Sequence, residues 1–246
     1  MHEDVAGKVK EVFRLSGSNR TSPSSQSFTI TSGLPMIISD AYQEIEGTIK
    51  YRLDFTLAPA ADESILAELN AWRTLLFRLR LNGRDPGRYG GLAYGNVSRR
   101  FEGRRFLVSG SQTGGLERLT AEHYSWVKHF DVETNLLVAE GPIQPSSEAL
   151  THAAAYEAAP GVNCVLHVHS PELWCHASEL AIPLTEPGIR YGTPEMAAAV
   201  CALLAEPTTR IIAMGGHQDG LIAAGATVPE AALLLVQKLA EAVRMI

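Results

Sequence analysis

The chain has 246 residues, of which 46% are hydrophobic and 20% charged, and its formal net charge at pH 7 is −6. This composition is that of an ordinary globular protein, and the length suits one large core with a small accessory piece. The acidic balance argues against nucleic-acid binding, because that function normally needs Lys and Arg clustered on one face. We therefore expect no nucleic-acid partner.

Two further features concern the compartment. No window approaches the roughly 18 to 20 apolar residues of a membrane span, and the first ten residues, MHEDVAGKVK, hold early acids and no apolar leader core. The three cysteines form no CxxC pair, and Cys164 and Cys201 lie in apolar runs typical of buried thiols. We expect a cytoplasmic protein with no membrane partner and no disulfides.

The N-terminal part divides into a tail and an extension. Residues 1–33 include the polar run SGSNRTSPSSQS, which offers too little apolar area to offset the entropy of ordering, so we predict a flexible tail. Residues 34–61 contain TIKYRLDFTL at 48–57, where apolar and polar residues alternate. This period predicts a half-buried strand, which we place at a sheet edge. Its buried face would carry Ile49, Tyr51, Leu53, Phe55 and Leu57.

Residues 62–246 form the predicted main domain, with element ends marked by capping residues, glycines and prolines. The first half predicts a helix from Asp62 to about Arg80, a solvated hairpin over 90–110 that turns at Glu102-Gly103, a short helix near Thr120 and a strand ending at Gly141-Pro142. The second half predicts a helix capped by Ser146 or Ser147, a strand at 164–169, helices at about 173–180 and 193–205, two strands around a turn at 210–225, and a last helix with Pro229 in its first turn. Hairpins outnumber parallel crossovers, which favours a mixed or antiparallel sheet covered by helices.

Two histidines end the apolar strand CVLHVH at 164–169. Because side chains alternate along a strand, His167 and His169 point to the same face as Val165. A single strand histidine is more often a hydrogen-bonded core or surface residue than a ligand, but two on one face can reach one ion. The HxH pair therefore indicates a candidate zinc site.

A third ligand has to come from elsewhere, and His217 in GGHQDGLIAAG is the best candidate, because it follows a strand where glycines permit close approach. The alternative is an ordinary turn histidine. Three histidines with an open fourth position describe a catalytic zinc rather than a structural one.

Glu148 is the candidate acid/base. It follows two serines at a helix N-terminus, where unpaired N–H groups favour an anion, although a glutamate there is also simple capping chemistry. The same helix end could instead hold a substrate phosphate through Ser146 and Ser147. His152 lies one turn later, and we expect it to pack beneath Glu148 rather than orient it. Two glycine turns, YGNVS and SGSQTGG, offer amides and small polar side chains for an anion, although each is also an ordinary turn.

Five blocks of the chain, taken in order, resemble the class II aldolase/adducin family, and the resemblance covers about residues 65–243. They are GNVS at 95–98, SGSQTGG at 109–115, PSSE at 145–148, HAAAYEAAPGVNCVLHVHSP at 152–171, and GH followed by DGLIAAG at 216–225. The resemblance implies a three-layer α/β/α domain with a central, mostly antiparallel sheet, to which the N-terminal strand extension is added. It also implies a homo-oligomer, commonly a tetramer, with active sites between subunits.

In the sugar-phosphate aldolases of this family, the HxH pair and a later histidine bind zinc, which implies one Zn²⁺ per chain on His167, His169 and His217. The glutamate of PSSE is the acid/base, here Glu148. The substrate phosphate would be held by Asn96, Thr113, Gly114, Ser146 and Ser147, with Ser109 and Gly110 as the alternative turn. The ion would stabilise an enediolate while Glu148 moves a proton at the adjacent carbon.

The sequence departs from the family pattern at two site positions. Gln218 and Asp219 separate His217 from Gly220, so the turn must bulge or Asp219 takes the ligand position; we favour His217. Tyr191, three residues beyond the place of the family's catalytic tyrosine, is the candidate for that role. We expect a zinc-dependent lyase acting on a small phosphorylated hydroxy-ketone, with a sugar-phosphate dehydratase or epimerase of the same family, or a non-catalytic adducin-like scaffold, as alternatives.

Overall fold

The computed structural model describes residues 47–246, so the predicted tail and the first part of the N-terminal extension lie outside the described residues. The strands of the described part are β1 (Arg52–Leu57), β2 (Gly83–Arg84), β3 (Ala93–Tyr94), β4 (Asn96–Arg100), β5 (Phe106–Ser109), β6 (Tyr124–Asp131), β7 (Leu136–Gly141), β8 (Cys164–His169), β9 (Ile211–Ala213) and β10 (Gly220–Gly225). The α-helices are α1 (Ala67–Arg78), α2 (Ala149–Ala158), α3 (Pro171–Cys175), α4 (Pro194–Leu204) and α5 (Val228–Val243).

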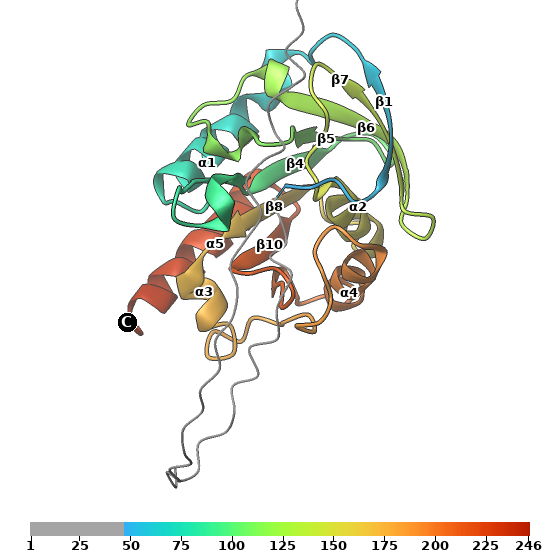
Figure 1. Cartoon of the computed structure of the whole chain (residues 1–246). Helices are drawn as coiled ribbons and strands as arrows, with labels where there is room; N and C mark the ends of the chain where they lie inside the picture. The colour runs from blue at the N-terminus through green and yellow to red at the C-terminus, as the bar shows by residue number, and fades with distance from the viewer. Residues whose placement is uncertain (1–46) are drawn as a thin grey trace, which may run out of the picture. The chain divides into compact units, whose positions relative to one another are not determined.

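Eight strands form one sheet in the order β1-β7-β6-β5-β4-β8-β10-β9, while β2 and β3 form a separate pair. The β1–β7 pair is parallel and the other neighbours in the large sheet are antiparallel. Helices α1, α3 and α5 cover one face of the sheet, and α2 and α4 cover the other (Figure 1). The predicted three-layer α/β/α fold with a mostly antiparallel sheet is confirmed.

The strand predicted over 48–57 forms the edge strand β1, which begins at Arg52. Tyr51, just before it, is buried, and Leu53 and Phe55 are half-buried, as the alternating pattern predicts. Leu57 was expected on the same buried face but is 78% exposed. It is the last residue of an edge strand, where covering elements end, so the alternation alone overstated its burial.

Strand β8 separates two hydrophobic cores. Cys164, Leu166 and Val168 lie in the core shared with α1 and α5, whereas Val165 lies in the core on the α2 and α4 side. This is the alternation expected of a strand buried on both faces. His167 and His169 are two and four residues beyond Val165, so they face the α2 side of the sheet.

The helix starts follow their capping residues in most places. Ser170, Thr193 and Thr227 each accept a backbone N–H at the start of a helix that has proline in its first turn. The predicted cap at Ser146 or Ser147 is wrong: α2 has Glu148 as its N-cap, without a side-chain cap bond. The two serines instead belong to the preceding turn, where Ser146 Oγ accepts the Glu148 N–H at 3.3 Å.

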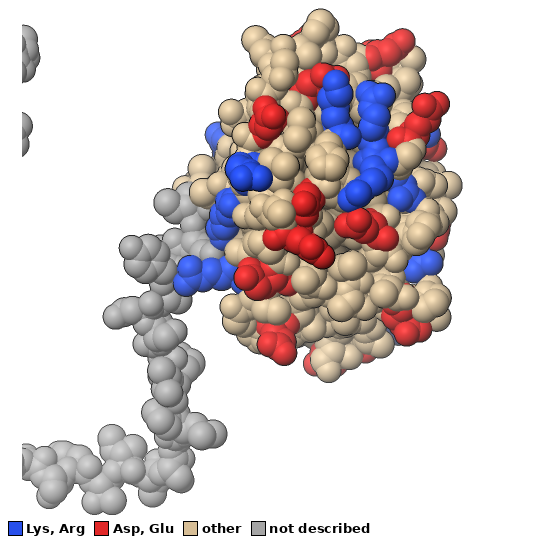
Figure 2. All heavy atoms as spheres, turned by 90° about the vertical axis from the view of Figure 1, so that its right-hand side faces the viewer, with Lys and Arg blue, Asp and Glu red and all other residues tan. Residues whose placement is uncertain are grey.

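Charged residues of both signs share the surface that faces the viewer in Figure 2. Lys and Arg side chains gather in one part of this face, and acidic side chains flank them. The basic side chains of the hairpin and of β6 form exposed ion pairs with nearby glutamates: Arg104 with Glu157, Lys128 with Glu140, and Arg99 with Glu68. Such exposed pairs contribute little to stability.

The expectations about the cysteines and about membrane-spanning segments can be compared with the structure. Cys164 is buried as expected, whereas Cys201 is half-buried because it lies toward the outer side of α4. Between residues 47 and 246, no helix is both long enough and apolar enough to cross a membrane.

Candidate metal centre and active site

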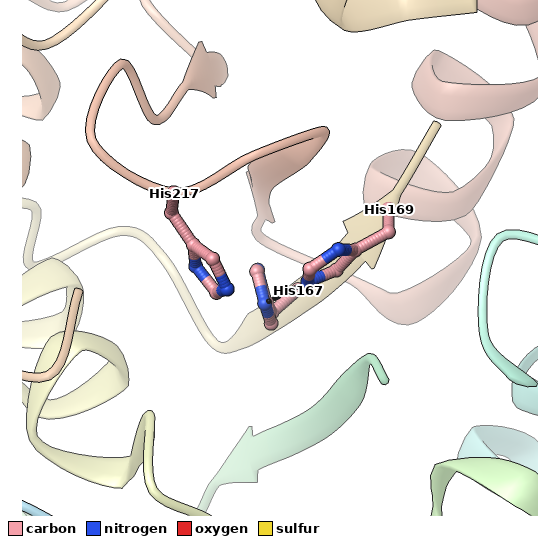
Figure 3. Close-up of side chains that lie close together, drawn as sticks. All are labelled: His167, His169 and His217. Carbon is pink, nitrogen blue, oxygen red and sulfur yellow. Dashed lines mark hydrogen bonds between the residues drawn. The ribbon is translucent and has the colours of Figure 1, made fainter. Parts of the chain in front are cut away.

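Three buried histidines meet where β8 and the β9–β10 turn approach each other. His167 and His169 are fully buried, and His217, in the turn, is 4% exposed. One ring nitrogen from each lies within 4.8 Å of the others, and the imidazoles point toward a common region (Figure 3). The sequence thus folds so that residues 50 positions apart form one cluster with the donor set and spacing to hold a metal ion.

The hydrogen bond made by His167 fits metal binding. His167 Nδ1 lies 3.0 Å from the Leu221 carbonyl oxygen; because that oxygen can only accept, Nδ1 donates and Nε2 carries the lone pair that a ligand needs. This Nε2 lies 3.1 Å from His169 Nε2, close to the ~3.3 Å expected of two nitrogens held tetrahedrally at ~2.0–2.1 Å from zinc. Burial, then His217, His167 and Arg88, lower the pKa of His169 well below its ordinary value, which favours the neutral, ligating imidazole.

The turn that carries His217 bulges, as its extra length requires. The His217 N–H donates to the Met214 carbonyl at 3.1 Å, and the Gly220 N–H donates to the His217 carbonyl at 2.9 Å. Asp219 has φ +61°, a left-handed conformation that Asp and Asn tolerate better than most residues. Its carboxylate accepts from Arg88 at 2.8 Å and from the Tyr89 hydroxyl at 2.7 Å. The bulge therefore lets His217 reach the cluster and engages Asp219 elsewhere.

We expect Asp219→Asn to lower the free energy of unfolding by about 1–3 kcal/mol, because a half-buried charge-assisted pair with Arg88 is lost. Asparagine tolerates the same backbone conformation, so the change isolates the charge. Urea unfolding measures the loss, and Glu140→Gln, which breaks the exposed pair with Lys128, is the control with an effect near zero. Zinc stoichiometry should stay that of the wild type; its loss in Asp219→Asn would make Asp219 the third ligand.

Glu148 lies beside this cluster at the start of α2. Its carboxylate is fully buried, and Oε1 is 4.0 Å from His217 Nδ1. The turn before it is held from the N-terminal extension, because the buried Tyr51 hydroxyl donates to the Ser146 carbonyl at 2.7 Å. Burial, then the Glu148 charge, raise the pKa of Tyr51, so this phenol stays protonated as a donor. The geometry brings a carboxylate within reach of the space next to the histidines.

Tyr191 stacks on the third histidine. The ring centroids of Tyr191 and His217 are 4.4 Å apart with the planes at 23°, and Tyr191 is 1% exposed. Its hydroxyl accepts the Thr48 N–H at 3.3 Å. On the far side, Lys50 Nζ lies 3.7 Å from the ring centroid and donates to the Tyr191 carbonyl at 2.9 Å. The ring therefore braces His217, and a catalytic role for the hydroxyl stays a prediction.

His152 is packed in the core, as expected. It is fully buried, and its Nδ1 lies 2.7 Å from Ser98 Oγ, which in turn is 2.6 Å from the Tyr156 hydroxyl. Burial, and then the nearby His167, lower the pKa of His152 well below its ordinary value. A neutral histidine in a buried hydrogen-bonded chain joins α2 to β4 and supports the strand next to β8.

A polar pocket opens between the glycine turns and the start of α2. Both glycine turns contribute to it, together with the two serines before Glu148, and its lining residues are Gly47, Ala93, Gly95, Asn96, Gly110, Ser111, Gln112, Gly114, Ser146 and Ser147. Five of the seven residues predicted to bind substrate line it: Asn96, Gly110, Gly114, Ser146 and Ser147. Glycines of both turns line this one pocket. The two turns are therefore not alternative anion sites, because both could contact the same bound anion.

The other two predicted substrate-binding residues use their hydroxyls inside the protein. Ser109 Oγ accepts the Val97 N–H at 3.0 Å, and Thr113 Oγ1 donates to the Gly110 carbonyl at 2.8 Å. Both residues are buried. They shape the turns rather than line the pocket.

Sequence reasoning missed the neighbours of the site that come from the N-terminal extension. The alternating pattern marked Tyr51 only as buried, and no local signal tied Lys50 to Tyr191, which lies 141 residues away. Arg73 could have been found from the sequence, because it lies on the buried face of α1, between Leu69 and Leu76. A charged residue at an apolar position of a helix indicates a specific buried partner.

The fold and site together describe an α/β/α protein with a candidate metal centre at the end of a central strand. A family model, Class II Aldolase and Adducin N-terminal domain, matches residues 88–245, and the chain belongs to this family. No curated protein matched the sequence.

Several solved structures share the fold at low sequence identity. The L-fuculose-1-phosphate aldolase from Thermus thermophilus is 24% identical with a TM-score of 0.53, over 74% of this chain and 91% of that one. Sugar-phosphate aldolase from Thermotoga maritima is 14% identical with a TM-score of 0.57, over 74% and 94%. YgbL from Escherichia coli is 18% identical with a TM-score of 0.57, over 73% and 87%. At these identities the likeness concerns the fold.

Proposed function

We propose that the chain is a zinc-dependent lyase of the class II aldolase type, acting on a small phosphorylated hydroxy-ketone. The observation that carries this proposal is the position of Glu148, a fully buried carboxylate 4.0 Å from a histidine of the three-histidine cluster. A carboxylate next to three histidine nitrogen donors combines a proton acceptor with a site for a Lewis-acidic metal ion. Proton transfer at a carbon next to a carbonyl group needs this combination. Membership of the class II aldolase and adducin family supports the same reaction class.

Each part of the site has a separate task in this proposal. His167, His169 and His217 would hold the ion, which when bound supplies a positive charge to a developing oxyanion of the substrate. In the lyase direction, Glu148 would take the proton of the substrate hydroxyl beside the carbon–carbon bond that breaks. The electron pair of that bond would pass to the carbon next to the carbonyl as the aldehyde leaves, and Glu148 would return the proton to that carbon. Tyr191, packed on His217, keeps that ring in place and excludes water from one side of the cluster.

The polar pocket would receive the substrate's phosphate. It is lined by residues of two glycine-containing turns and by Ser146 and Ser147. The backbone amides and hydroxyls of such residues are donors suited to anion oxygens. Asn96 of the pocket is the first residue of β4, which pairs with β8 so that Asn96 lies opposite His167. The pocket and the cluster therefore share two adjacent strands, which suits a substrate with a phosphate at one end and a carbonyl at the other.

Zinc-loaded protein incubated with a panel of sugar phosphates tests the proposal. We expect aldehyde release from at least one hydroxy-ketone phosphate, and no release by His167→Ala protein treated in the same way. Water loss without aldehyde would identify a dehydratase, and inversion of one carbon an epimerase of the same family. A wild-type chain that binds zinc but turns over none of these substrates would support a non-catalytic, adducin-like scaffold.

A further inference from the structure

Arg73 of α1 carries a buried positive charge whose hydrogen-bond acceptors are all backbone carbonyls. The residue is 2% exposed. Nη2 donates to the carbonyls of Thr113, at 3.1 Å, and Gly114, at 2.6 Å, and Nη1 donates to those of Leu116 and Glu117. Within residues 47–246 no carboxylate forms an ion pair with it.

A buried guanidinium without a counter-ion is unusual, because taking a charge out of water is costly unless an opposite charge offsets it. Burial lowers the pKa of Arg73 to about 10, so the group is still protonated at neutral pH. The carbonyl dipoles satisfy its hydrogen bonds but leave one net positive charge. Arg78, on the same helix, is the contrast: it is exposed and pairs with the Glu117 carboxylate at 3.1 Å.

The charge lies directly behind one wall of the polar pocket. Gly114 lines that pocket and accepts from Arg73 on its other side. In a trans peptide the C=O and N–H point in opposite directions, so the Thr113 carbonyl facing Arg73 turns the Gly114 N–H away from the guanidinium. A Cβ on Gly114 would lie 2.2 Å from the Tyr94 carbonyl oxygen, so this wall requires glycine.

The pocket itself has no charged side chain among the residues that line it in the described part of the chain. A phosphate monoester brings about two negative charges at neutral pH. One guanidinium behind a wall of polarised peptide groups would offset part of that charge across a short, low-dielectric path. Among residues 47–246, Arg73 is a buried cation without a counter-ion, and the pocket next to it has no cation of its own for an anion. A bound anion would supply the first and Arg73 the second.

We propose that Arg73 is the buried counter-charge of the pocket and makes it selective for doubly charged anions over singly charged ones of similar size. The inference rests on the proposed function in one respect, the use of this pocket for an anionic group. It adds that the selectivity comes from a residue of α1, which lies before residues 88–245 matched by the family model and touches the turn, not the ligand.

Isothermal titration of the zinc-loaded full chain with sulfate and with methanesulfonate, at fixed ionic strength, tests this. The two probes are similar in size but carry two and one negative charges. We expect wild-type protein to bind sulfate about 10-fold tighter than methanesulfonate. Because the Coulomb energy scales with the charge of the anion, Arg73→Met should lose about 10-fold in sulfate affinity and only about 3-fold in methanesulfonate affinity. Arg78→Met removes an exposed charge from the same helix and should leave both affinities unchanged.

Equal losses for the two probes in Arg73→Met would overturn the proposal and leave Arg73 as a clamp on the turn. If Arg73→Met does not fold, two other measurements test the inference. Arg73→Lys keeps the positive charge and should keep the preference for sulfate. A wild-type protein that binds sulfate and methanesulfonate equally well would contradict the inference. Absence of sulfate binding overturns the use of the pocket for anions. Zinc content measured on the same samples tests the metal centre separately.

Discussion

His167→Ala is expected to lower zinc affinity by at least about 100-fold, from a wild type that holds about one zinc per chain. Four-ligand zinc sites bind with about 10–16 kcal/mol, so one ligand accounts for roughly 3 kcal/mol. His167 should be the most sensitive position, because its Nδ1 is already held by the Leu221 carbonyl and its Nε2 is 3.1 Å from that of His169. Chelator competition with metal analysis measures the change.

The matched control is His129→Ala, an exposed histidine of β6 that should leave zinc content unchanged. Circular dichroism of His167→Ala in the metal-free form separates loss of a ligand from loss of the fold. A wild type that takes up no zinc, or a His167→Ala protein that retains it with unchanged affinity, would show that the cluster is a packed group of core histidines. Removal of zinc by chelator should likewise abolish the activity found with the substrate panel.

Glu148→Gln is expected to reduce kcat by about 10²- to 10⁴-fold while zinc affinity and the fold are kept, because general base catalysis supplies an effect of that size. Glutamine has the same shape and cannot accept a proton at neutral pH. Glu148 is the N-cap of α2 but makes no side-chain cap bond, so the change does not remove a helix cap. A fall in kcat with little change in KM would separate proton transfer from binding.

Glu157→Gln is the control on the same helix, since Glu157 is exposed and pairs with Arg104. Its kcat should equal that of the wild type. Retention of full activity by Glu148→Gln would refute the assignment of the base and direct attention to Tyr191, whose ring stacks on His217. The pH dependence of kcat/KM, compared between Glu148→Gln and Glu157→Gln, would then show whether Glu148 or another group titrates.

The elements of the fold could be predicted because their signals are local. Alternation over 48–57 indicated the edge strand, Pro229 marked the first turn of α5, and the apolar period of α1 marked its buried face. The predicted N-cap of α2 was wrong, because its position depends on a single residue. The predicted burial of Leu57 was wrong because the described part of the chain leaves that side chain uncovered at the sheet edge. Cap positions and edge burial depend on what packs against the element.

The candidate site was predictable as a set of residue types and less so as an arrangement. The HxH pair needed only the two-residue period of a strand, because neighbours i and i+2 share a face in any sheet. The choice between His217 and Asp219 depended on how a bulged turn orients two side chains, which residue spacing does not specify. Ser109 and Thr113 matched the pattern of an anion-binding turn, yet both hydroxyls are used within the protein.

By itself, the sequence determined a mixed or antiparallel sheet covered by helices, the strand that carries the HxH pair and the residue types of the candidate site, because periodicity and capping are encoded over a few neighbouring positions. The three-layer arrangement was implied by the family resemblance. Only the tertiary structure decided that His217 reaches the cluster, that Lys50 and Tyr51 of the extension contact Tyr191 and Ser146, and that Arg73 lies behind the pocket. These contacts join residues 40 to 141 positions apart. Their geometry is set by the packing of helices on the sheet, a property of the whole core that no local stretch contains.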